Sequence, residues 1–149
     1  MPGSAWRLRS DDLRLAIRQS PSLHQLLLRY VQAFQVQTAH TALSNGGYNI
    51  EERLARWLLM CHDRVDGDDL PLTHEFLSIM LGVRRSGVTL AIQILEGAKI
   101  VKAQRGLPII LDRAKLEEIA GDGYGPPEAE YARLMARSGD GEAGIDGDW

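Results

Sequence analysis

Hydrophobic residues recur every three or four positions along most of the chain, a spacing that places them on one face of a helix. The longest run follows Ser20-Pro21, a pair typical of a helix start, and extends to about Ser44. Within it, apolar positions step by four, three and four residues, as in a coiled-coil seam. These positions are Leu23, Leu27, Tyr30 and Phe34. The pattern predicts a long helix that stops at Asn45-Gly46-Gly47.

A second helical pattern covers residues 50–64, "IEERLARWLLMCHDR". Asn49 is suited to cap its first turn, and Glu51 and Glu52 suit the positive end of the helix dipole. Apolar residues at helical spacing predict its buried face, which comprises Ile50, Leu54, Trp57, Leu58 and Cys61.

Two short helices separated by one glycine are predicted next. Thr73 is expected to cap a helix that ends near Met80, and Gly82 interrupts the pattern where a turn would favour a positive φ. A second helix is expected from about Arg84 to Glu96. Six apolar residues would form the core shared by the two helices: Leu77, Leu81, Val83, Val88, Ile92 and Leu95.

A β-hairpin is predicted after this pair of helices. Ile100 and Val101 lie on one arm, residues 109–111 on the other, and Arg105-Gly106 at the turn. A short capped helix should then end at Gly121. The fold class expected is mainly α with a small β-hairpin wing, in which a long dimerisation helix precedes a winged helix-turn-helix domain.

The predicted elements divide the chain into three parts. Residues 1–46 form an N-terminal segment and dimerisation helix, and residues 47–121 form the winged helix-turn-helix domain. Residues 122–149 are rich in glycine, proline and acidic residues, and we expect them to be disordered apart from a transient helix over residues 129–137.

The charge distribution favours nucleic acid as the partner of the middle part. The chain has 149 residues and a net charge of −3, which gives no global signal for DNA binding. Residues 73–115, however, hold seven Lys and Arg against three Asp and Glu, whereas the segment from 121 onward is strongly acidic. The chain is therefore interpreted as a basic module with an acidic tail.

The second helix of the pair presents side chains suited to reading DNA bases. Once its core positions are removed, Arg85, Thr89 and Gln93 remain in one exposed line at a spacing of four residues. Arg pairs with guanine, Gln reads adenine, and Thr meets a thymine methyl or a phosphate. Arg84 and Arg105 are expected to contact phosphates. The predicted DNA-binding residues are Thr73, Arg84, Arg85, Ser86, Thr89, Gln93 and Arg105.

The segment "LTHEFLSIMLGVRRSGVTLAIQILEGAKIVKAQRGLPIILDRAKLEEIA" resembles the C-terminal DNA-binding domain of the Crp/Fnr family of bacterial transcription regulators. "EERLARWLLMCHDR" is similar to the preceding helix in that family, and "LLLRYVQAFQVQ" to the end of its dimerisation helix. The resemblance implies a homodimeric, sequence-specific regulator that binds double-stranded DNA, with RNA polymerase as a further candidate partner.

Two departures from the family limit what the resemblance implies. The family often presents Arg-Glu and then a second Arg one turn later, whereas Ser86 stands in place of the Glu and Leu90 in place of the second Arg. The family's operator sequence is therefore not transferred. The chain also starts where the family's effector-sensing β-roll would end, so we expect either a regulator without its own effector domain or a fragment of a longer protein.

No pattern of catalytic residues is found, so an enzyme is not expected. The four histidines lack metal-ligand spacing, the lone cysteine lies in an apolar run, and we expect no metal or cofactor. The absence of an apolar leader or membrane-length run favours a cytoplasmic protein. Two alternatives stay open: a winged-helix interaction module, including one that forms a heterodimer with a full-length relative, and an enzyme subunit containing such a domain.

Overall fold

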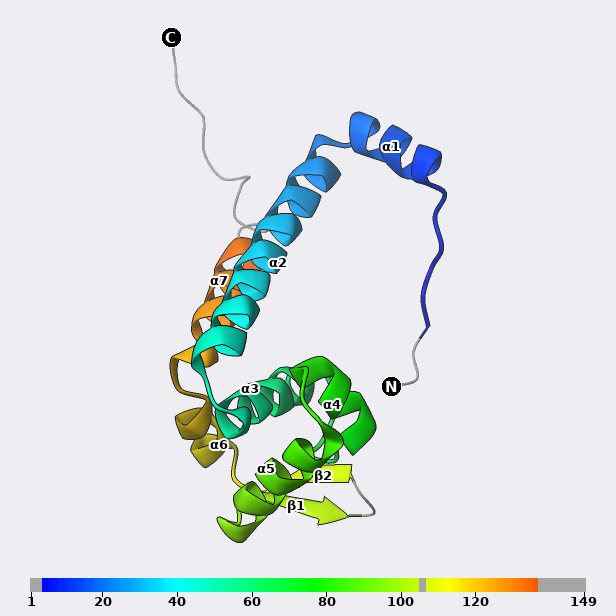
Figure 1. Cartoon of the computed structure of the whole chain (residues 1–149). Coiled ribbons are helices and arrows are strands. Elements are labelled where there is room, and N and C mark those ends of the chain that lie inside the picture. The colour runs from blue at the N-terminus through cyan, green and yellow to red at the C-terminus, as the bar shows by residue number, and fades with distance from the viewer. Residues whose placement is uncertain (1–3, 105–106, 137–149) are drawn as a thin grey trace. The chain divides into compact units, whose positions relative to one another are not determined.

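The computed structural model describes residues 4–104 and 107–136, which form helices and one short hairpin (Figure 1). The elements in chain order are α1 Ser10–Gln19, α2 Pro21–Gly47, α3 Ile50–His62, α4 His74–Leu81, α5 Arg85–Gly97, β1 Val101–Gln104, β2 Leu107–Ile110, α6 Arg113–Ala120, the 3-10 helix η1 Gly121–Gly123, and α7 Pro126–Ala136. The described residues form two compact units: the first comprises residues 4–38 together with 127–136, and the second comprises residues 39–126. The mainly α fold with a hairpin wing is as predicted.

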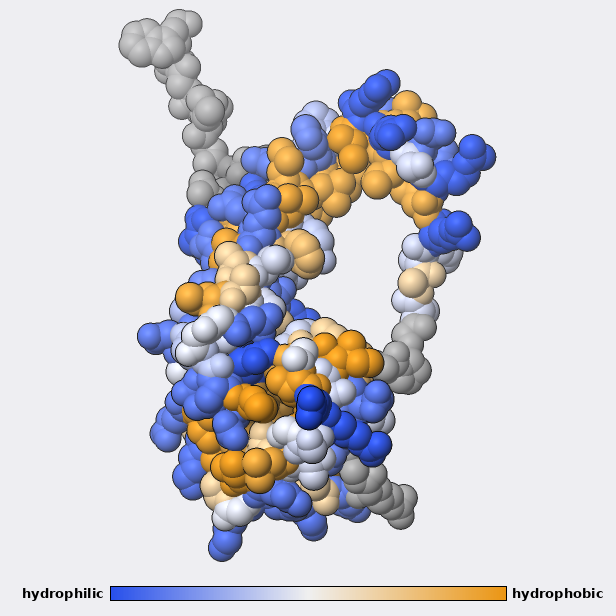
Figure 2. Space-filling model, viewed as in Figure 1, coloured by the Kyte–Doolittle hydropathy of each residue, from blue (hydrophilic) through white to orange (hydrophobic). Residues whose placement is uncertain are grey.

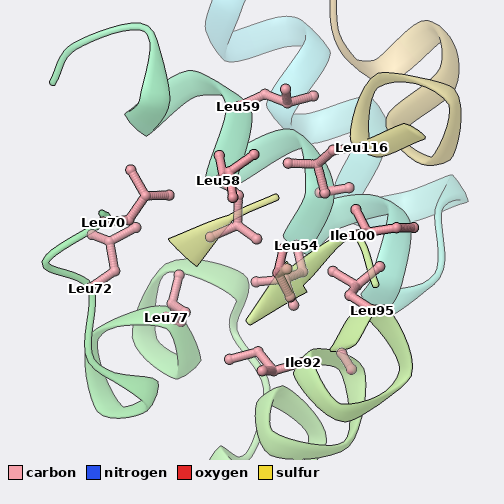
Figure 3. Packing of buried hydrophobic residues seen from close by; sticks show 14 of the residues in the cluster. Leu54, Leu58, Leu59, Leu70, Leu72, Leu77, Ile92, Leu95, Ile100 and Leu116 are labelled. Atoms are coloured by element: carbon pink, nitrogen blue, oxygen red, sulfur yellow. The ribbon is translucent and has the colours of Figure 1, made fainter. Parts of the chain in front are cut away.

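The core of the second unit is built from α3, α4, α5, α6 and the hairpin (Figure 3). Five of the six apolar residues predicted for the helix pair are buried, and Val83 is half-buried against them. The predicted face of α3 behaves in the same way, because Leu54 and Leu58 are fully buried and the other three residues pack at the edge. The helical spacing of apolar residues therefore identified this core correctly.

Helix starts in this unit follow the sequence closely. The Asn49 side chain accepts a hydrogen bond from the Glu52 backbone N–H, and the Glu52 carboxylate accepts one from Asn49, so α3 begins with a capping box. The Asp112 carboxylate accepts from the Lys115 N–H and caps α6 in the same manner. These local bonds satisfy backbone donors that no helix can satisfy internally.

The hairpin pairs antiparallel, with Val101 opposite Ile110 and Gln104 opposite Leu107. Its arms match the prediction, whereas the predicted turn at 105–106 lies outside the described residues. The loop after α3 adds to the hairpin in a way that the sequence did not predict. Asp69 forms a bridge with Ile109, and the Leu70 N–H donates to the Pro108 carbonyl at 3.0 Å. The loop after α3 therefore pairs with strand β2 of the wing.

In the first unit, Ser20 caps α2 as predicted, accepting a hydrogen bond from the Leu23 N–H at 3.2 Å. α2 continues to Gly47, slightly beyond the predicted end. None of the described helices is long and apolar enough to cross a membrane.

The segment expected to be a mostly disordered tail differs from that expectation, since it contains η1 and α7, which overlaps the expected transient helix. Pro127 and Leu134 are buried in α7, and their spacing of seven residues places them on one face. Arg133 also pairs with Glu130 at 2.6 Å. The segment therefore contains a helix with one apolar face, although its acidic, proline-rich composition predicted disorder. Residues 137–149 lie outside the described residues.

Candidate DNA interface

A three-residue turn joins α4 to α5. Thr73 caps α4, with its Oγ1 accepting a hydrogen bond from the Phe76 N–H at 3.1 Å. Gly82 ends the helix in the left-handed region, at φ 63° and ψ 34°, and the Val83 N–H donates back to the Ser78 carbonyl at 3.0 Å. The positive φ predicted for Gly82 is therefore present, and the small side chain of Ser78 is buried beside the turn. The arrangement is that of a helix-turn-helix.

Two arginines stand at the start of α5 with free side chains. Arg84 is the N-cap residue, yet its side chain makes no capping bond. Both Arg84 and Arg85 are exposed. Among the described residues, neither guanidinium has a hydrogen-bond or ion-pair partner. Each can therefore bind an acceptor on another molecule without first breaking a contact within the protein.

The predicted line of Arg85, Thr89 and Gln93 is only partly free. Gln93 is exposed, and so is the neighbouring Ser86. Thr89 is half-buried, and its Oγ1 donates to the Arg85 carbonyl at 3.0 Å and lies 3.1 Å from His74 Nδ1. The hydroxyl of Thr89 is thus engaged within the protein.

Sequence reasoning missed two residues on this surface. From the sequence, His74 is considered only as a metal ligand, whereas at the first position of α4 it contacts α5 through Thr89. Leu90 is 58% exposed on α5, at a spacing of four from Ser86 and three from Gln93, which places it on the outward face. Leu90 could have been found by the same helical spacing that selected Gln93.

The wing is attached to the end of α5. The Glu96 carboxylate accepts a hydrogen bond from the Ala103 N–H at 3.0 Å, which joins α5 to β1. Lys102 is exposed on β1, whereas the predicted wing-tip contact, Arg105, lies outside the described residues. The wing therefore exposes one cationic side chain among its described residues. In the described part of the chain, no group of three or more metal-ligating side chains occurs.

The predicted seam of α2 is divided between half-buried and exposed positions. Leu23 and Leu27 are half-buried, whereas Tyr30 is 54% and Phe34 58% exposed. Hydrophobic side chains are visible on the surface of α2 in Figure 2. Other exposed apolar residues on this helix are Leu26, Leu28, Val31 and Leu43.

Residues 52–119 match the family model of the Crp-like helix-turn-helix domain. This segment of the chain is similar to that domain in sequence and has its fold. The matched segment runs from α3 to α6 and so includes both helices of the turn and the wing.

Two solved structures are similar to this chain, and the first of them shares its fold. One is TTHB099, a transcriptional regulator of the CRP family from Thermus thermophilus, with 24% sequence identity and a TM-score of 0.54 over 64% of this chain and 50% of that chain. Another is the Thermus thermophilus catabolite activator protein, with 24% identity and a TM-score of 0.45 over 76% of this chain and 53% of that chain. The chain thus spans about half the length of these structures. No curated protein matches it.

Proposed function

We propose that this chain is a sequence-specific transcription regulator that binds double-stranded DNA through its Crp-like domain. The observation that carries the proposal is the pair of exposed arginines at the start of α5, whose guanidinium groups have no partner in the described part of the chain. In a helix-turn-helix, the second helix enters the major groove with its N-terminal residues at the base edges. Arg85 is then suited to pair with guanine, and Arg84 to meet a phosphate.

The other residues predicted to contact DNA lie on α5, at the start of α4 and on the wing. Ser86 and Gln93 are exposed on α5, and Thr73 is exposed at the N-terminus of α4, where backbone N–H groups favour a phosphate. Lys102 is exposed on the wing, and we expect Arg105, which follows it in the sequence, to contact a phosphate. The surplus of positive charge over residues 73–115 supports binding to a polyanion.

We further propose that the protein acts as a homodimer through α2. Tyr30 and Phe34 are large apolar side chains, and more than half of each remains exposed. A second copy of the same helix would cover them in a parallel seam. Two recognition helices would then read two half-sites related by the symmetry of the dimer.

A binding titration tests both parts of the proposal. Duplexes selected by the protein from a random-sequence pool should be bound in preference to scrambled duplexes of equal length. The affinity should fall steeply as salt concentration rises, because counterions are released from the phosphates. A dimer that binds no duplex selectively would instead favour an interaction module, and a protein that stays monomeric would remove the two-half-site arrangement.

A further inference from the structure

Two successive hydrogen bonds join the first residue of α4 to helix α5. His74 Nδ1 lies 3.1 Å from Thr89 Oγ1, and Thr89 Oγ1 lies 3.0 Å from the Arg85 carbonyl oxygen. All three residues are in the helix-turn-helix, and Thr89 and Arg85 are on the face proposed to enter the groove. The hydrogen bonds therefore bear on what Thr89 can offer to a base.

The donor of each of these two hydrogen bonds can be assigned from the number of protons available. The Thr89 hydroxyl carries one proton, and it is donated to the Arg85 carbonyl. With that proton in use, the bond to His74 is assigned to the tautomer in which the imidazole Nδ1–H is the donor and Thr89 Oγ1 the acceptor. His74 Nε2 is buried, and it has no hydrogen-bond partner among the described residues, so the bond through Nδ1 is the polar contact that orients the ring.

The bond from His74 distinguishes Thr89 from an ordinary helical threonine. A threonine in a helix often donates to the carbonyl four residues earlier, and it can release that bond by rotating about χ1. At Thr89, rotation would break two bonds, one of which comes from another helix. The hydroxyl is thus held toward the protein, with its only proton in use.

We propose that Thr89 reads the 5-methyl group of a thymine through its own Cγ2 methyl, and that His74 is the positioning residue that holds the hydroxyl away from the bases. This inference rests on the proposed function, since it requires α5 to lie in the major groove. There, thymine is the base that presents a methyl group. A threonine whose hydroxyl is engaged offers a matching apolar contact.

Replacement of thymine by uracil tests the methyl contact, because it removes only that methyl group. The probe is the duplex selected from a random-sequence pool, with each dT of a half-site changed to dU in turn. Wild-type protein should lose about threefold to tenfold in affinity at one position, the scale expected for one buried methyl group. Thr89→Ser removes the protein's methyl and should abolish this penalty. Thr89→Val removes the hydroxyl but keeps a methyl, so this variant should show the same uracil penalty as the wild type.

Two outcomes would overturn the methyl contact. One is a full uracil penalty in both Thr89→Ser and Thr89→Val, which would mean that another side chain covers the thymine methyl. The other is a penalty that survives in Thr89→Ser and disappears in Thr89→Val, which would assign the reading to the hydroxyl. Gln93→Ala is the matched control on the same face of α5, and it should leave the uracil penalty at this position unchanged. If no duplex is preferred over scrambled DNA, the proposed function itself fails, and this inference fails with it.

The role of His74 is tested by two substitutions. Asn places an amide nitrogen near the position of imidazole Nδ1, so His74→Asn should keep the bond to Thr89 and the uracil penalty. His74→Ala frees the hydroxyl to rotate and should reduce the penalty to less than about twofold, because the methyl is no longer held in one place. If His74 had only a structural role, His74→Ala would lower the affinity for all duplexes equally. The ratio of the affinities for the dT and dU duplexes would then stay unchanged. An unchanged ratio in a folded His74→Ala protein would overturn the positioning role.

Discussion

Tyr124 donates its hydroxyl proton to the carboxylate of Asp63, 61 residues earlier in the chain, with an O–O distance of 2.8 Å. Asp63 is the C-cap residue of α3, and Tyr124 follows η1. Arg113 at the start of α6 completes the cluster, with its Nη2 2.9 Å from Asp63 and 2.6 Å from the Tyr124 oxygen. The three residues tie the start of α6 and the segment after η1 to α3, the helix against which α4 and α5 pack.

The first prediction concerns the stability of this cluster. Tyr124→Phe removes a hydroxyl that bonds to two charged groups, and should lower the free energy of unfolding by about 1–2 kcal/mol. Urea unfolding followed by the fluorescence of Trp57, which is half-buried at the core edge, measures the change. Tyr131→Phe is the matched control, since Tyr131 is 51% exposed in α7. Equal stability of the two variants would show that the cluster contributes little.

The second prediction concerns alkaline pH. Burial and the neighbouring Asp63 carboxylate raise the pKa of Tyr124 from 10.0 to about 12. A pKa raised in the folded state stabilises the protein below the unfolded pKa, and that contribution is lost as pH rises through the folded pKa. The difference in stability between wild type and Tyr124→Phe should therefore shrink between pH 10 and 12. A difference that stays constant over this range, measured by urea unfolding at each pH, would contradict the assignment.

The third prediction concerns the end of the recognition helix. Lys99 adopts a φ of 58°, the one described non-glycine residue with a positive φ. Its N–H donates to the Glu96 carbonyl, and the Ile100 N–H donates to the Leu95 carbonyl, as in a Schellman motif. Lys99→Gly should stabilise the protein by about 0.5–1 kcal/mol, because glycine relieves the left-handed strain at some cost in chain entropy.

Lys99→Ala separates the backbone effect from the loss of charge. Alanine removes the ammonium but keeps the Cβ that disfavours this conformation, so its stability should stay within about 0.5 kcal/mol of wild type. Thermal unfolding of the three proteins at matched concentration makes the comparison. If alanine stabilised the protein as much as glycine, the relevant factor would be charge rather than backbone strain.

Features that depend on neighbouring residues could be predicted from the sequence. Asn49, Thr73 and Asp112 cap helices because the hydrogen bond is made within the next three residues. Gly82 ends α4 because it reaches the left-handed region without a Cβ clash. Helical spacing likewise identified the buried residues of the helix pair.

Features that join distant residues could not be predicted in this way. Nothing in the local sequence of His74 indicates that it lies beside Thr89, fifteen residues later. The cluster of Asp63, Arg113 and Tyr124 likewise forms only after α3 and α6 have packed together. Composition also failed to predict α7 in full. This acidic segment was expected to be disordered apart from a transient helix, but it forms a helix with one buried leucine and an ion pair.

The fourth prediction tests the proposed seam of α2. Phe34→Asp places a charge on a helix surface where a second chain would need apolar contact, and the dimer should dissociate at micromolar concentration. Gln32→Asp adds the same charge two residues earlier, on the opposite side of the helix, and should leave the dimer intact. Sedimentation velocity distinguishes the two results. A wild-type protein that is already a folded monomer would contradict the homodimer.

The last prediction assigns different roles to the two arginines at the start of α5. Arg85 shares a line with Thr89 and Gln93, so it should meet base edges, whereas Arg84 lies before the helix and should meet phosphate. Arg85→Ala should cost about 1–3 kcal/mol on the preferred duplex and relax the preference at one base pair of each half-site. Arg84→Ala should weaken preferred and scrambled duplexes alike and reduce the slope of log affinity against log salt by about one. Titration of both variants against both duplexes at several salt concentrations separates these effects. Equal weakening of both duplexes by Arg85→Ala would remove α5 as the reading helix.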